Sequence, residues 1–203
     1  MKKVLLAVAL VALMAGTSFA NIGGSAHDFS TLLPAVTDEI CIYCHTPHNA
    51  DTIVTDAPLW DHVTTTATYT LYSSSTLNAT MNQPSGISKL CLSCHDNTVA
   101  VDSFGTNVGA STISTFGTGT ANLGPNGLSD DHPVGFTYDT TLAGNDGGLN
   151  DPATDAAVAA LLFGSQMECA SCHDVHNQGP VGALSLLRID NAGSALCTTC
   201  HIK

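Results

Sequence analysis

The sequence is short of basic residues, and the few that it has are unevenly placed. The chain of 203 residues contains five lysines and arginines against 17 aspartates and glutamates, a formal net charge of −12. Two of the five, Lys2 and Lys3, lie at the N-terminus, which leaves Lys89, Arg188 and Lys203 for the rest. Nucleic-acid binding needs a positively charged surface, so this composition excludes a nucleic-acid partner. An acidic surface favours solubility and attracts basic partners or cations.

Aromatic residues and long apolar runs are also scarce. Phe, Trp and Tyr make up 5% of the chain. The longest apolar run, 4–15, is shorter than the about 20 residues that a membrane-spanning helix needs. It follows Lys2 and Lys3 and precedes Ser18-Phe19-Ala20, the pattern of a secretory signal and its cleavage site. We therefore predict a cleaved signal peptide over 1–20, no membrane span, and a single exported domain over 21–203.

Cysteine, by contrast, is present eight times and always in one pattern. Cys-x-x-Cys-His occurs at 41–45, 91–95, 169–173 and 197–201, here called motifs 1 to 4. This spacing is the attachment signal for c-type haem. The two thiols add to the vinyl groups of the haem, and the histidine ligates the iron from one side. The sequence thus predicts four covalent haems, held by Cys41, Cys44, Cys91, Cys94, Cys169, Cys172, Cys197 and Cys200. Their proximal iron ligands are His45, His95, His173 and His201.

Four haems change the expected fold, because the porphyrins supply the apolar mass that the composition lacks. Eight thioether bonds then act as the staples that small scaffolds need. We expect irregular coil with short α-helices at the haem motifs, little β-structure and haems as the core. Pro84-Ser85-Gly86 precedes a predicted helix through motif 2, Ser194 begins a predicted final turn, and the Ala- and Leu-rich stretch 151–164 predicts another short helix. The stretch 97–127 predicts a loop with a short hairpin.

The remaining histidines are candidates for the second axial position. Imidazole is the commonest such ligand, and five histidines are left for four irons. His48 and His176 each follow a proximal histidine by three residues, so neither reaches the far face of its own haem, and each is expected to ligate a neighbouring haem. His132 and His27 complete the predicted set, with Asp28 as an orienting partner for His27. His62 is the expected spare, and the rival ligands Met81 and Met167 are less favoured.

Five segments of the chain resemble a known family. They are 41–50, 57–62, 88–96, 129–136 and 168–177, which combine the haem motifs with Cys-His-x-x-His and Asp-His-Pro elements. They resemble secreted tetrahaem cytochromes, including those that polymerise into extracellular filaments in metal-reducing bacteria. The resemblance implies a haem stack that continues between subunits, with one axial histidine crossing the interface. On this basis we expect His48 to ligate the haem at His201 of an adjoining subunit.

The function expected from these patterns is electron transfer and not enzymatic catalysis. The expected partners are other redox proteins or extracellular electron acceptors, and the expected location is extracellular. A monomeric periplasmic shuttle is the main alternative. A multihaem reductase needs an open iron position and often a Cys-x-x-Cys-Lys motif, which this sequence lacks. A zinc protein also uses Cys-x-x-Cys pairs, but a histidine follows every pair here.

Overall fold

The computed structural model of the protein describes residues 22–52, 54, 57, 59–116, 122–124, 127–176 and 186–202. The predicted signal peptide, 1–20, lies outside these residues. Within them, no helix is long and apolar enough to cross a membrane.

Short helices joined by long coil segments make up the described chain, as the sequence predicts. The longest helix has ten residues, and the strands have two residues each. In chain order, the elements are α2 (Phe29–Leu32), η1 (Ile40–Tyr43), α3 (Gly86–His95), η2 (Ile113–Phe116), η3 (Gly127–Ser129), β1 (Phe136–Thr137), α4 (Thr140–Asp146), α5 (Ala156–Ala159), β2 (Gln166–Met167), α6 (Cys169–Cys172), η4 (Ala192–Ser194) and α7 (Ala195–Cys200).

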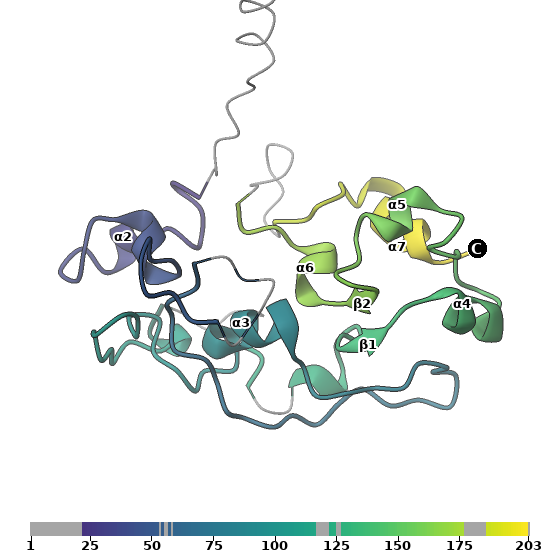
Figure 1. Ribbon diagram of the computed structural model, residues 1–203, viewed down its shortest axis with the longest axis horizontal. Helices are drawn as coiled ribbons and strands as arrows, with labels where there is room; N and C mark the ends of the chain where they lie inside the picture. The colour runs from purple at the N-terminus through teal and green to yellow at the C-terminus, as the bar shows by residue number, and fades with distance from the viewer. Residues whose placement is uncertain are drawn as a thin grey trace, which may run out of the picture.

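The elements spread along one long axis (Figure 1). Helix α2, which contacts η1, lies at one end, and α4, α5 and α7 lie at the other, with α3 and α6 between them. Strands β1 and β2 form an antiparallel pair in which Phe136 faces Met167. The chain therefore carries motif 1 near one end of the molecule and motif 4 near the other.

The apolar core is divided into two small clusters. One contains Phe136, Tyr138, Leu142, Val158 and Met167 and supports the end with α4, α5 and α7. The other is centred on Leu92 of α3, which is fully buried against Tyr69 and Leu128. Isolated helices of four to ten residues are unstable in water, so α3 to α7 depend on these contacts and on local caps.

The predicted helix over 151–164 is shorter than expected. Only Ala156–Ala159 is helical, and the Asp155 carboxylate caps it by accepting the N–H groups of Ala157 and Val158. Asp151 instead forms a turn of its own, in which its carboxylate accepts the N–H of Ala153 at 2.9 Å. Aspartate side chains compete with helix formation in this way. The hairpin expected within 97–127 is also absent from the described part of that stretch, which contains η2 and coil.

Candidate functional site

Each Cys-x-x-Cys-His motif folds as one helical turn. The N–H of the motif histidine donates to the carbonyl of the first cysteine at 2.9 Å in motif 1, 3.0 Å in motif 3 and 2.9 Å in motif 4, and motif 2 forms the last turn of α3. Residues three and four positions apart lie on one face of a helix. Both thiols and the imidazole of each motif therefore project to the same side, as attachment to a single haem requires.

Pairing between distant backbone segments fixes three of the motif histidines. His45 forms a β-bridge with Trp60, His173 with Leu187, and His201 with Leu149. The bridge at His201 is extended by the N–H of Ile202, which donates to Gly148 at 2.8 Å. The stretch around Leu149 thus folds back over motif 4.

The cysteine thiols form no disulfides, and six of the eight are partly buried. Burial is the main cause that raises the pKa of Cys44 to about 11, of Cys94 to about 12 and of Cys200 to about 11. Thiols held apart in pairs, rather than oxidised, are the form that attachment to haem vinyl groups needs.

Thiols of successive motifs lie close to one another. Cys44 and Cys94 interact electrostatically across motifs 1 and 2, and Cys172 and Cys197 do so across motifs 3 and 4. Between them, the side chains of Cys91 and Cys169 form a hydrogen bond that raises the pKa of Cys91 and lowers that of Cys169. In the order 1, 2, 3, 4, each motif therefore has a thiol that interacts with a thiol of the next motif.

A buried set of polar residues, here called the α3–α6 latch, fixes motifs 2 and 3 to each other. The Glu168 carboxylate accepts the N–H of Ser88 at 2.9 Å, and the Ser88 hydroxyl accepts the N–H of Cys169 at 2.9 Å. The hydroxyl of Ser171 accepts the N–H of Glu168 at 2.9 Å. Glu168 is 3% exposed, and both serines are more deeply buried. This latch was not predicted from the sequence, because the only sign of it there is the position of Glu168 just before motif 3.

Three motif histidines face three of the predicted distal histidines. The ring centroids are 6.0 Å apart for His95 and His27, 6.0 Å for His45 and His176, and 6.3 Å for His201 and His132. A first-row metal ion lies about 2.0 Å from an imidazole nitrogen, so two imidazoles on opposite sides of one ion have centroids roughly 6 Å apart. Each ring pair has the spacing of an axial ligand pair.

His27 provides the clearest test of whether these residues fit a haem. Its Nδ1 is buried and lacks a hydrogen-bond partner. Burial, with repulsion from His95, lowers the pKa of His27 to about 4. The ring is therefore neutral at physiological pH, which is the form of imidazole that ligates metals. The expectation that Asp28 orients this ring is wrong, because the Asp28 carboxylate accepts the N–H of Gly24 and the hydroxyl of Ser30.

His62 and His48 differ sharply in their surroundings. His62 is 2% exposed, and its two ring nitrogens lie 2.7 Å from the carbonyl oxygen of Val63 and 3.0 Å from that of Ala100. Burial lowers the pKa of His62, and a neutral imidazole has one N–H, so the ring donates to one of these two carbonyls. His48 is exposed, and within the described part of the chain its ring makes no hydrogen bond or aromatic contact.

The methionines occupy packing positions. Met167 is 4% exposed within the core cluster of Phe136 and Val158, and Met81 is half-buried against the same cluster.

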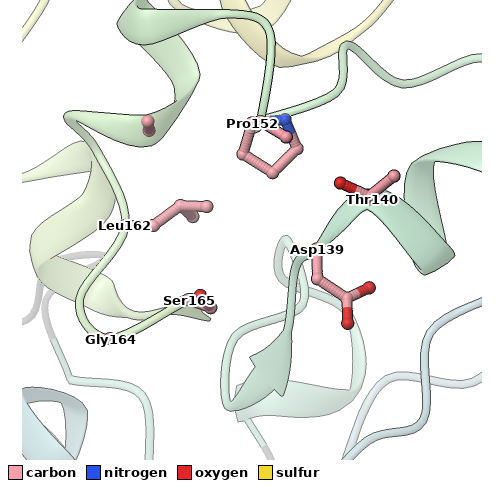
Figure 2. Close-up of a pocket in the computed structure, with 8 residues that line it drawn as sticks. Asp139, Thr140, Pro152, Leu162, Gly164 and Ser165 are labelled. Atoms are coloured by element: carbon pink, nitrogen blue, oxygen red, sulfur yellow. The ribbon is translucent and has the colours of Figure 1, made fainter.

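Other kinds of site receive little support. Among the described residues, no group of three or more His, Cys, Asp or Glu side chains is arranged to hold a metal ion, whereas structural zinc needs four such ligands. A pocket of about 420 Å³ lies between the start of α4 and the segment after α5, where Asp139 and Thr140 face Leu162 and Ser165 (Figure 2). No cysteine or histidine lines it, so it is separate from the haem-attachment residues.

Comparison with known proteins identifies the repeated motif. A family model described as the doubled CXXCH motif matches residues 163–203, which contain motifs 3 and 4. No curated protein matches the chain. The family match points to a multihaem c-type cytochrome, with haem bound covalently at the CXXCH motifs and a role in electron transport.

Proposed function

We propose that this chain carries four c-type haems, each with histidine on both sides of its iron, and that it transfers electrons along them. The observation that carries the proposal is the approach of three motif histidines to three distal histidines at centroid distances of 6.0 to 6.3 Å. These are three independent pairs, and each joins segments far apart in the sequence.

Bound haem supplies one-electron chemistry at the iron, and the protein supplies its position and electrostatics. In this chain the motif turns hold the thiols and proximal imidazoles on one side, while the coil segments carrying His27, His132 and His176 bring the distal imidazoles to the other. The α3–α6 latch keeps the attachment sites of motifs 2 and 3 close together. The arrangement favours transfer between neighbouring haems and requires no substrate pocket.

We further propose that the protein acts outside the cell as a polymer in which the haems of adjoining subunits form one path. The predicted signal peptide and the family resemblance support export and assembly. The positions of motifs 1 and 4 near opposite ends of the long axis support a head-to-tail contact (Figure 1). Exposed apolar side chains lie at both ends, Leu32, Val36 and Ile42 near motif 1 and Ile202 beside motif 4.

His48 is the histidine that we propose crosses the interface. Its exposure leaves it available to an adjoining subunit. Because His201 faces His132 within the chain, the haem at His201 is no longer the best target for His48. His48 would therefore either displace His132 there or ligate another haem of the adjoining subunit.

Spectroscopy of the secreted protein tests the ligation. Four haems with low-spin absorbance and electron paramagnetic resonance (EPR) signals are expected, because imidazole is a strong ligand on both sides. A persistent high-spin signal, or reduction of nitrite at enzymatic rates, would instead favour a reductase with an open iron position.

Electron microscopy of wild-type, His48→Ala and Thr52→Ala proteins tests the polymer. Thr52 is an exposed residue of the same segment and serves as the matched control. Filaments are expected from wild type and Thr52→Ala, whereas His48→Ala should give unassembled subunits. Filaments of normal length from His48→Ala with four low-spin haems would refute the cross-subunit ligand. A wild-type protein that stays monomeric with four low-spin haems would identify the periplasmic shuttle.

A further inference from the structure

Asp96, which directly follows the motif 2 histidine, is a buried carboxylate enclosed by donors. Its side chain accepts the hydroxyls of Thr65 and Tyr69, both at 2.6 Å. It also accepts the hydroxyl of Thr98 at 2.6 Å and the N–H of Thr98 at 2.8 Å. Asp96 is 1% exposed. All four contacts donate a hydrogen to the carboxylate, which is the pattern of an ionised group.

No positive charge neutralises this carboxylate within the part of the chain that is described. The ion pair found there joins His176 and Asp174, and no lysine or arginine lies within bonding distance of Asp96. The surrounding groups are hydroxyls, amides and the apolar cluster of Tyr69 and Leu92. A charge in such a low-dielectric setting acts on its neighbours far more strongly than a solvated charge.

Motif 3 provides a natural comparison, because Asp174 follows His173 as Asp96 follows His95. The Asp174 side chain is 30% exposed, and it lies 3.8 Å from the ring of His176. Water and mobile ions screen a charge in this position. The two aspartates therefore share a sequence position but differ in burial.

We propose that the charge of Asp96 tunes the redox potential of the haem at Cys91 and Cys94. It makes this haem harder to reduce than its axial ligands alone would make it. The inference rests on the proposed function. Reduction adds one electron from an external donor to the ferric iron and gives ferrous iron, without bond cleavage or proton transfer. The added electron is repelled by the fixed negative charge beside His95, so the oxidised form of this haem is favoured.

The test is a potentiometric titration of the haem-loaded protein in an optical cell with an electrode. Asp96→Asn keeps the shape and removes the charge. One of the haem transitions is expected to move to more positive potential by at least 59 mV. For a one-electron transition, this shift raises the ratio of reduced to oxidised haem tenfold at a fixed potential. Asp174→Asn should move its transition by less than half as much. Equal shifts in the two variants, or no shift in Asp96→Asn, would overturn the proposal.

Tyr69→Phe gives an independent test with the opposite sign, and it remains available if Asp96→Asn does not fold. This change removes one donor to the carboxylate and leaves the charge in place. The less compensated charge should move the same transition to more negative potential. A positive shift, or none, would contradict the proposal. If Asp96 had a purely structural role, the potentials of Asp96→Asn and Tyr69→Phe would not shift in opposite directions.

The mass of each purified protein separates this inference from the proposed function. If the wild-type protein lacks four attached haems, the proposed function fails. If all four are attached and the potentials of Asp96→Asn match those of wild type, only the role of Asp96 fails.

Discussion

Glu168 is predicted to hold the two central haem motifs together, and its removal tests this directly. Glu168→Ala deprives the buried N–H of Ser88 of its acceptor, now 2.9 Å away. An unsatisfied buried donor costs on the order of 1–3 kcal/mol, so the free energy of unfolding should fall by about 2 kcal/mol. For a chain of this size, 1 kcal/mol corresponds to about 2–4 °C in Tm. We therefore expect Tm to fall by roughly 6 °C.

The assay is thermal unfolding of the haem-loaded protein, followed by far-ultraviolet circular dichroism. Glu39→Ala is the matched control, because Glu39 also lies just before a haem motif but is exposed and makes no side-chain cap. Its Tm should change little. Ser88→Ala removes the acceptor of the Cys169 N–H, and the double variant with Glu168→Ala should show coupling of about 1 kcal/mol. Equal Tm shifts in Glu168→Ala and Glu39→Ala, or strict additivity in the double variant, would refute the latch.

Four further variants test other parts of the molecule. His27→Ala should give a high-spin haem signal. His62→Ala should keep all haems low-spin and lose about 1–3 kcal/mol of stability, since a buried backbone carbonyl loses its donor. The reverse pattern in the EPR spectra would exchange their roles. Burial acts to raise the pKa of Asp96, but hydrogen bonds from Thr65, Thr98 and Tyr69 hold it below the ordinary value of 3.8. The ionised carboxylate therefore stabilises the folded protein at pH values above 3.8, and this stabilisation is lost as the pH falls through the lower pKa of the folded state. In an acid titration, the free energy of unfolding should consequently fall less steeply for Asp96→Asn than for the wild-type protein. Gly86→Ala should lower Tm, because Gly86 has φ +51° and an added Cβ would lie 2.8 Å from Glu168 Oε1. An unchanged Tm would contradict the close approach of the Glu168 carboxylate to Gly86.

The local structure of the haem motifs was predictable, because attachment chemistry fixes their residue types and spacing. The sequence places two thiols and a histidine at intervals that match one helical turn, and the structure has such a turn at every motif. The helix over 151–164 was overestimated for an equally local reason. Asp151 and Asp155 are separate turn and cap residues, and Asp155 alone starts the helix.

The pairing of distal with proximal histidines was not predictable, because it depends on how long coil segments fold back. The sequence predicts that His176 ligates a neighbouring haem, but not that its ring faces His45. The roles of Asp96 and Glu168 were missed for a related reason. Both adjoin haem motifs, yet their partners Tyr69 and Ser88 come from other segments and become visible only in the fold.

Intact-mass measurement of the secreted protein shows whether haem is attached covalently at all four Cys-x-x-Cys-His motifs. We expect a single species with the mass of residues 21–203 plus four haem groups, which persists after denaturation because thioether bonds survive it. A polypeptide that carries no haem, or fewer than four after denaturation, would rule out a tetrahaem electron carrier.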